Sequence, residues 1–206
     1  MSADSRRLKR FLLAVVVWLP LAFLGWSVLS SALVWVPGQL SGWVLSGLWP
    51  ALFDGASHSG ADWQAVTGIM VQQPGSKALG QLIFDLNPMV YGYSLPLFFG
   101  LAMATHLTPW QRTLQCLIVL PVLWLVQTFG MITGALKLVV FDAGSQGAAA
   151  AKVAGLSPDV VALCYQFGYL ILPAVVPVVL WILLNRRFID KLGRSEDQAP
   201  EEPAAP

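Results

Sequence analysis

The stretch RRLKRFLLAVVVWLPLAFLGWSVLSSALVW, residues 6–35, decides the class of this protein. Four Lys and Arg residues precede an apolar run that extends over about 11–35. At about 1.5 Å per residue, a helix over this run is longer than the roughly 30 Å of hydrocarbon in a bilayer. A cleaved signal peptide has an apolar core of only about 7–15 residues, so we expect a retained membrane helix. Cleavage near Ser30-Ser31-Ala32, a weak match to a cleavage site, is the alternative.

The composition supports this assignment for the whole chain. Of the 206 residues, 56% are hydrophobic and only 11% are charged, whereas soluble domains have about 25% charged residues. Such a chain cannot cover a water-exposed surface with polar groups. A net charge of +1 also excludes the strongly basic field expected of a nucleic-acid-binding protein.

Three further apolar runs follow the first, over about 89–106, 113–136 and 160–184. We therefore predict an all-α membrane protein with about four transmembrane helices, forming a single integral membrane domain over 1–194. Nine of the twelve Lys and Arg residues lie before the first span, between the second and third, or after the fourth. By the positive-inside rule, both termini are expected to be cytoplasmic. The acidic, proline-rich segment 195–206 is predicted to be a disordered cytoplasmic tail.

The longer extracytoplasmic loop is predicted over 36–87. Its first part, 36–53, has an apolar face that includes Leu40 and Trp43, as in an amphipathic helix. Such a helix could lie in the membrane surface or pack on the spans, and both alternatives stay open. A polar, glycine-containing link is expected over 54–60.

Two extended stretches, 63–72 and 80–86, predict a small β-hairpin in the same loop. Pro74-Gly75 between them suits the centre of a type II turn. An isolated hairpin is only marginally stable in water, so we expect it to pack on the membrane domain or on a partner. The second outer loop, over about 137–159, is alanine-rich and shows no motif for chemistry.

The spans contain little that indicates catalysis or transport. No Asp, Glu, Lys or Arg lies in the middle of any predicted span, which argues against a proton-coupled transporter. Cys116 and Cys164 fall in apolar stretches and are interpreted as inert packing residues, although Cys116 could meet His106. We therefore predict no catalytic residue, no metal site and no cofactor.

Small and uncharged polar residues within the spans favour close helix packing. Gly130 and Gly134 form a small-xxx-small pair, which permits close approach of another helix. Four polar residues could hydrogen-bond between helices or face a partner: Gln127, Thr128, Thr133 and Gln166.

The densest local signal is NPMVYGYSLPLF, residues 87–98, where the hairpin enters the second span. A helix cap, a proline suited to a helix start and two interfacial tyrosines explain part of it. A further glycine and proline could leave the helix start open to a partner. The candidate partner-contact residues are therefore Asn87, Pro88, Tyr91, Gly92, Tyr93 and Pro96.

This segment resembles the signature of the exosortase H-associated membrane proteins. The resemblance extends from Arg6 to Phe188. It includes the start, with Arg6-Arg7, Phe11-Leu12-Leu13 and Trp18-Leu19-Pro20, and the end, with Gly168-Tyr169-Leu170, Pro173, Pro177, Trp181 and Asn185-Arg186-Arg187-Phe188. It implies a bacterial inner-membrane protein that accompanies an exosortase, a multi-spanning cysteine transpeptidase that processes proteins with a C-terminal sorting signal. The family has no established catalytic residues to transfer.

The resulting hypothesis is a non-enzymatic accessory that contacts an integral membrane partner, an exosortase, or its substrates, within membrane lipids and without nucleic acid. An exosortase-type site uses Cys with Arg and His near the outer face, and this chain has no Arg in its predicted outer loops. Two alternatives stay open. One is a scaffold subunit of another cell-envelope machine, and the other is a membrane-embedded cysteine enzyme.

Overall fold

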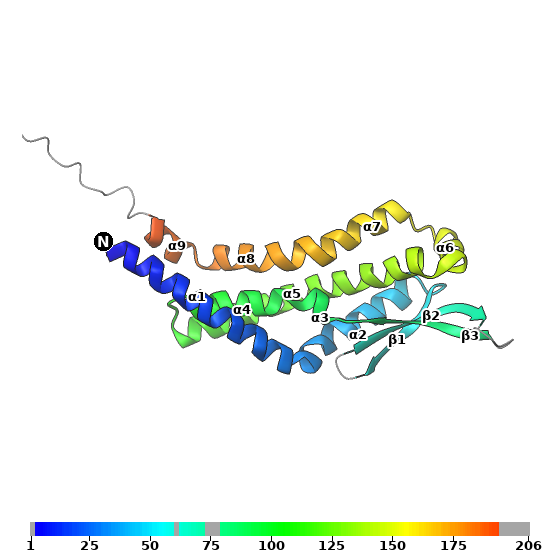
Figure 1. Cartoon of the computed structure of the whole chain (residues 1–206), viewed down its shortest axis with the longest axis horizontal. Helices are drawn as coiled ribbons and strands as arrows, with labels where there is room; N and C mark the ends of the chain where they lie inside the picture. The colour runs from blue at the N-terminus through cyan, green and yellow to red at the C-terminus, as the bar shows by residue number, and fades with distance from the viewer. Residues whose placement is uncertain (1–2, 60–61, 73–78, 194–206) are drawn as a thin grey trace, which may run out of the picture.

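A computed structural model describes residues 3–59, 62–72 and 79–193. The predicted Pro74-Gly75 turn and the predicted disordered tail, 195–206, lie outside these residues. Figure 1 labels the α-helices and strands, and the elements have the following bounds: α1 (Ala3–Val28), α2 (Ser30–Leu48), β1 (Phe53–Ser59), β2 (Asp62–Gln72), β3 (Leu79–Leu86), α3 (Met89–Gly92), α4 (Ser94–Ala104), α5 (Pro109–Lys137), the π-helical η1 (Leu138–Asp142), α6 (Gly144–Val153), α7 (Pro158–Gln166), the π-helical η2 (Phe167–Ile171), α8 (Leu172–Leu184) and α9 (Arg186–Gly193).

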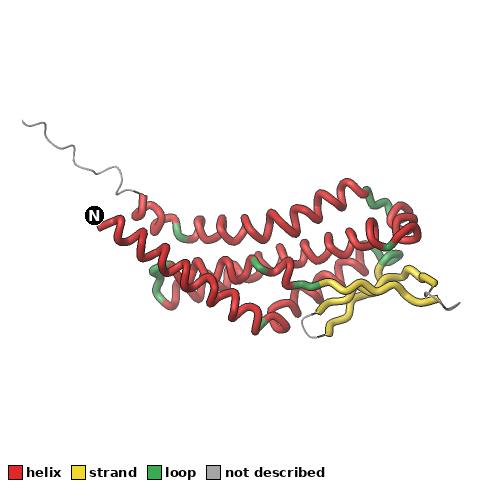
Figure 2. The backbone as a smooth tube through the Cα atoms, in the orientation of Figure 1, coloured by secondary structure: helices red, strands yellow, loops and turns green. Residues whose placement is uncertain are grey.

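The described helices form an elongated bundle with a small sheet at one end (Figure 2). Three helical runs are long and apolar enough to cross a bilayer, namely Leu8–Val28, Pro109–Asp142 and Pro158–Leu184. Met89–Ala104 is a shorter apolar run, interrupted at Tyr93. The membrane class and the mainly helical fold are confirmed, and the number of about four spans is approximate.

The first and third predicted spans end at other residues than the sequence predicted. The first helix ends at Val28, and α2 begins after a bend at Leu29, whereas one span over about 11–35 was expected. Helix α5 continues through the π-helical η1 to Asp142, beyond the predicted end at 136, because η1 packs against α6 and α7 with Val139 and Val140 buried and does not form a loop.

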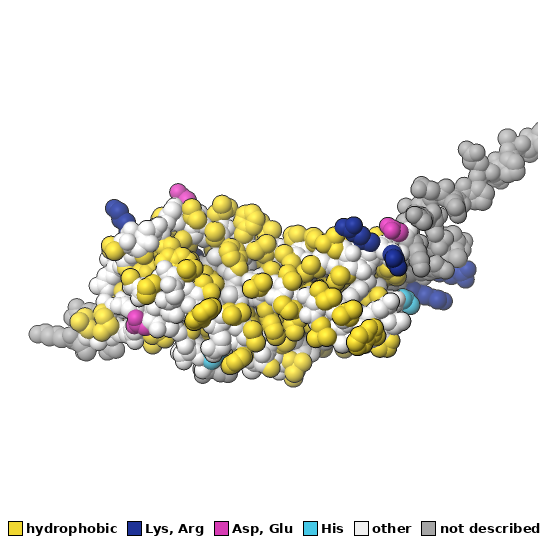
Figure 3. All heavy atoms as spheres, turned by 180° about the vertical axis from the view of Figure 1, so that it is seen from behind, with side chains coloured by type: hydrophobic (Ala, Val, Ile, Leu, Met, Phe, Trp, Pro, Cys, Tyr) yellow, Lys and Arg dark blue, Asp and Glu magenta, His cyan; other side chains and the backbone are white. Residues whose placement is uncertain are grey.

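The two described ends of the chain lie at the same end of the bundle (Figure 1). Phe11 of α1 stacks on Trp181 of α8 with ring centroids 5.6 Å apart, and it meets Phe188 of α9 edge-on at 5.5 Å. In Figure 3, Lys and Arg side chains gather at this end, and hydrophobic side chains cover the middle of the molecule. We call this end the cationic end and the opposite one the sheet end.

Most of the residues that helix α2 buries are small, whereas its two tryptophans, Trp35 and Trp43, are exposed. Gly38, Ser41 and Gly42 are buried, whereas 77% of the Trp43 side-chain surface is exposed. This arrangement is typical of membrane helices, which associate through small residues because lipid chains accommodate large apolar ones. The structure therefore favours packing on the other helices over a helix lying alone in the membrane surface. The helix also ends at Leu48, not at the predicted 53.

The sheet has the order β1-β2-β3 with both pairs antiparallel. Strands β2 and β3 confirm the predicted hairpin, in which Trp63 lies opposite Leu86 and Val66 opposite Ile83. The register shifts between Val66 and Met70, where the amide of Gly68 donates to the carbonyl of Leu52 instead of continuing the ladder. This bulge explains the imperfect alternation in that strand.

The prediction of a polar link over 54–60 was wrong, because 53–59 forms the edge strand β1. Phe53 is almost fully buried, while Asp54, Ala56 and Ser57 are exposed, so the strand buries little beyond its first residue. The apolar signal of a strand is therefore weak in this segment, although hydrogen bonds to β2 hold it in the sheet.

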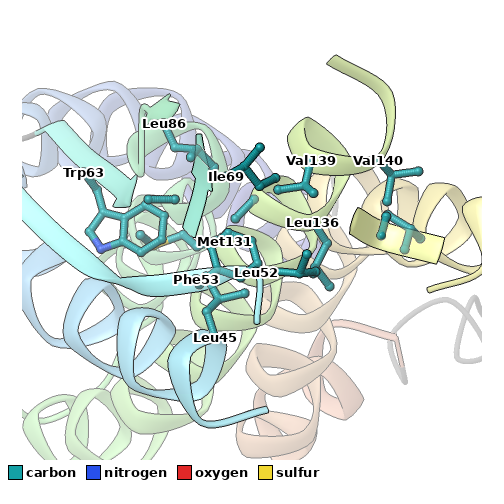
Figure 4. Packing of buried hydrophobic residues seen from close by; sticks show 14 of the residues in the cluster. Leu45, Leu52, Phe53, Trp63, Ile69, Leu86, Met131, Leu136, Val139 and Val140 are labelled. Carbon is teal, nitrogen blue, oxygen red and sulfur yellow. The ribbon is translucent and has the colours of Figure 1, made fainter. Parts of the chain in front are cut away.

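The sheet docks on the helices through one continuous apolar core (Figure 4). Trp63 is fully buried, and its indole N–H donates to the carbonyl of Gly38 in α2 at 3.0 Å. Leu45, Phe53 and Met131 join the same cluster from α2, β1 and α5. Burying each large side chain contributes about 1.5–3 kcal/mol, so the sheet is firmly part of the bundle.

Replacing Gly42 by leucine is expected to lower the unfolding temperature in detergent. A β-carbon at Gly42 would lie 2.7 Å from Cβ of Ala56, so the sheet must shift, and such overpacking costs about 1–3 kcal/mol. The matched control is Gly47→Leu, because a β-carbon at Gly47 meets no atom within 4 Å. The unfolding temperature of each variant is measured by heating samples in detergent and determining the remaining folded protein by size-exclusion chromatography. Equal losses in the two variants would contradict the close packing of α2 on β1.

Candidate functional site

The predicted contact segment joins the sheet to the membrane helices. Asn87 follows β3, and its side-chain oxygen accepts a hydrogen bond from the amide of Met89 at 2.9 Å. Pro88 has helical dihedral angles immediately before α3. The expected cap and helix start are therefore present, and they turn the chain from β3 into α3.

Four of the six candidate residues are buried within this chain: Pro88, Tyr91, Gly92 and Pro96. The ring of Tyr91 packs against Gly130 and Gly134 of α5, so a β-carbon at either glycine would clash with it. A β-carbon at Gly130 would also lie 2.9 Å from the carbonyl oxygen of Gly168 in η2. The small-xxx-small pair is therefore in contact with the Tyr91 ring and the Gly168 backbone of the same chain.

A buried amide holds the start of α3 in place. Gln127 of α5 is fully buried, and its side-chain N–H donates to the carbonyl of Pro88 at 3.1 Å. A β-carbon at Gly92 would lie 2.8 Å from the same nitrogen, so only glycine leaves room for this contact. The hydroxyls of Thr128 and Thr133 bond to carbonyls within α5, while Gln166 is exposed. Of these four polar residues, Gln127 therefore joins two elements of the bundle.

The accessible part of the segment consists of Asn87, Val90 and one side of Tyr93. Asn87 is exposed, and 40% of the Val90 surface is exposed. The hydroxyl of Tyr93 donates to the carbonyl of Leu170 in η2 at 3.2 Å, which fixes the ring beside that helix. Contact of this segment with a partner stays a prediction, and these three residues are the ones that a partner can reach.

The sheet carries an apolar patch that the sequence prediction did not single out. Met70, Leu79 and Ile83, the sheet patch, are 53%, 66% and 47% exposed. Met70 lies opposite Gln81, between Leu79 and Ile83 on β3, so the three side chains occupy one face. Gln81, which donates to Asp54, lies among these three side chains, and the hydrogen bond between Gln64 and Asp85 lies beside Ile83. The patch could have been found from the alternation of residues 79–86, since every second residue of β3 is exposed and Leu79 and Ile83 are two of them.

The cysteines and histidines are distributed without a reactive arrangement in the described residues. Cys116 packs against the apolar core near the cationic end, and Cys164 is half-buried on α7. The ring of His58 in β1 packs against Gly38 of α2. Its Nε2 is buried and has no hydrogen-bond partner among the described residues. Burial lowers the pKa of His58 below its usual value, so the ring is neutral at pH 7. Among these residues, no three His, Cys, Asp or Glu side chains are grouped as metal ligands.

The family assignment rests on a match along nearly the whole chain. The model of the exosortase H-associated membrane protein family matches residues 5–188. The chain belongs to this family. The match runs from the first turns of α1 to Phe188 in α9, and so includes the contact segment, the sheet and the bundle. The expected membership in the exosortase H-associated family is confirmed. No curated protein and no solved structure matches the chain.

The packing of Tyr91 on Gly134 predicts a non-additive pair of substitutions. Gly134→Ala is expected to destabilise the protein strongly, because the new methyl group meets the Tyr91 hydroxyl and ring. In a Tyr91→Ala background the same change should cost at least about 1 kcal/mol less, since the opposing ring is gone. Unfolding free energies of the four proteins in detergent give the coupling. Additive effects would show that the ring does not occupy this groove.

Proposed function

We propose that this protein is a non-enzymatic accessory of an exosortase-type protein-sorting system in the bacterial inner membrane. The observation that carries the proposal is the family match over residues 5–188. The resemblance implies that the partner is the sorting transpeptidase. The accessory contacts this enzyme or its substrates and assembles, stabilises or presents them.

The proposed orientation puts both termini in the cytoplasm. Nine of the twelve Lys and Arg residues belong to segments on that side, and positive loops are retained there. The contact of Phe11 with Phe188 supports this orientation, because it keeps the two described ends of the chain together. The sheet end then faces the outside, which is the side where an exosortase-type site operates.

The proposed contact surface combines the sheet patch with the accessible residues of the contact segment. Exposed apolar side chains bordered by polar ones are the usual composition of a protein interface. Asn87, Val90 and Tyr93 continue this surface toward the membrane, where an integral partner must also lie. Pro88, Tyr91, Gly92 and Pro96 act behind it by fixing the turn from β3 into α3.

A glutamate in the sheet patch should weaken copurification of the exosortase. Ile83→Glu puts a charge into the apolar sheet patch, and loss of an apolar contact at an interface costs about 1–2 kcal/mol, or roughly a fivefold to thirtyfold weaker affinity. The matched control is Gln146→Glu on α6, which adds the same charge at an exposed position outside the patch. Affinity purification in mild detergent with quantitative mass spectrometry measures the recovered enzyme.

The possible outcomes distinguish a failure of the proposed contact surface from a failure of the proposed accessory role. Reduced recovery for Ile83→Glu alone is the expected result. Equal recovery for both variants would reject the sheet patch but not the accessory role. Failure of the wild-type protein to recover an exosortase, under conditions that preserve other membrane complexes, would reject the accessory role itself.

The non-enzymatic role predicts that the thiols are dispensable. The charge of Arg112 acts on Cys116, but this thiol packs against an apolar cluster, and among the described residues no base is hydrogen-bonded to either cysteine. The variant with both Cys116→Ala and Cys164→Ala should therefore process sorting-signal substrates in cells at the wild-type rate. Immunoblots of substrate processing, normalised to the level of this protein, measure it. Loss of processing with normal protein levels would support the cysteine-enzyme alternative.

A further inference from the structure

The cationic end of the bundle contains a cleft that the proposed partner contact does not use. It has a volume of about 620 Å³ and lies between the beginning of α5, the end of α8 and α9. Its lining includes His106, Gln111, Leu114, Ile118, Arg186 and Arg187. Among the described residues no Asp or Glu lines the cleft, so the two arginines set the charge of this part of it.

The polar part of the cleft is a pair of available cations. Arg186 and Arg187 are exposed, and neither forms an ion pair with another described residue. His106, in the loop between α4 and α5, and Gln111 of α5 line the same space. Adjacent guanidinium groups with further donors nearby are suited to the oxygens of a phosphate group.

The apolar part of the cleft is open and aliphatic. Leu114, Ile118, Leu183 and Leu184 line it, and between 38% and 54% of each side chain is exposed. Further exposed apolar residues of the same helices, Leu117 and Val179, continue this surface toward the middle of the bundle. The cleft therefore has a cationic end and an aliphatic wall that runs along the membrane-spanning helices.

A hydrogen-bonded support beneath the cleft fixes the arginines in position. Asn185 ends α8 and is 3% exposed. It exchanges two side-chain hydrogen bonds with Gln115 of α5, at 3.1 and 3.3 Å, and donates to the carbonyl of Trp181 at 2.9 Å. Phe188 then packs on Phe11 and holds α9. The break between α8 and α9 thus keeps Arg186 and Arg187 beside α5.

We propose that this cleft is a binding site for an anionic phospholipid. Arg186 and Arg187 bind the phosphate of the headgroup, and one acyl chain lies along Leu114, Ile118 and Leu183. Charge complementarity selects an anionic ligand, and the aliphatic wall selects a ligand with a hydrocarbon chain. Basic pockets between helix ends at the membrane boundary bind anionic headgroups in this way. Each cation near an anionic lipid surface raises the affinity by about tenfold or less.

Native mass spectrometry of the full chain in mild detergent tests this site. Phosphatidylglycerol and phosphatidylcholine of equal chain length are titrated separately. The wild type is expected to retain phosphatidylglycerol at least about tenfold more strongly. The double change Arg186→Gln with Arg187→Gln should abolish the preference. Arg6→Gln with Arg10→Gln is the matched control, because it removes two exposed cations at the same end that do not line the cleft.

A second variant tests the aliphatic wall without changing charge. Ile118→Trp places a bulky side chain in the open cleft and should reduce phosphatidylglycerol binding severalfold. Ile118 is 54% exposed, so the fold tolerates the change, and circular dichroism checks the helix content. Binding that survives this variant would overturn the assignment of the acyl chain.

Four outcomes would overturn the lipid proposal. Equal binding of the two lipids by the wild type would exclude an anionic headgroup site. An equal loss in the arginine control would indicate a general surface charge effect. Displacement of the lipid by millimolar inorganic phosphate would indicate a soluble anion site. The last outcome concerns the chain's own acidic tail, which would be the ligand of the cleft if lipid bound only to the variant with the tail neutralised by Glu196→Gln, Asp197→Asn, Glu201→Gln and Glu202→Gln.

Discussion

The structure depends on close approach of backbones inside a solvent that offers no hydrophobic drive for helix association. In hydrocarbon, helices gain little from burying leucine and gain more from van der Waals contact and hydrogen bonds between them. Gly130 and Gly134 meet this requirement by admitting the Tyr91 ring and the Gly168 carbonyl. Gly38 and Gly42 do the same for the sheet on α2. The large apolar side chains are left for the lipid, as the exposed Trp43 illustrates.

This packing determines which surfaces can serve a partner. The contact segment was expected to offer an open helix start, but Gln127 and the α5 glycines occupy most of it. The turn from β3 into α3 is therefore mostly buried, and its contacts with α5 hold the sheet against the bundle. What stays accessible is the sheet patch at one end and the cleft at the other, so a protein partner and a lipid could be bound together without competition.

Hydropathy and caps were sufficient to predict the membrane class, three long helical runs and the pairing of β2 with β3. Strand β1 could not be predicted because its stability comes from ladder bonds to β2 and one buried residue, Phe53, which leave almost no pattern in its side chains. The packing of α2 could not be decided from the sequence, since a large apolar face indicates a core in water but a lipid contact in a membrane. The groove for Tyr91 depends on residues 39 and 43 positions away, and a single sequence does not reveal such pairs.

The shortness of the run Met89–Ala104 has a consequence for biogenesis. At about 1.5 Å per residue it extends only about 24 Å, less than the hydrocarbon thickness, so it is a poor candidate for independent insertion. Most of α4 is enclosed by α1, α5 and α8, and a β-carbon at Gly100 would touch the backbone of Leu19 in α1. Stable insertion of α4 therefore depends on packing against the other helices, above all α1, which is long and apolar enough to cross the membrane by itself.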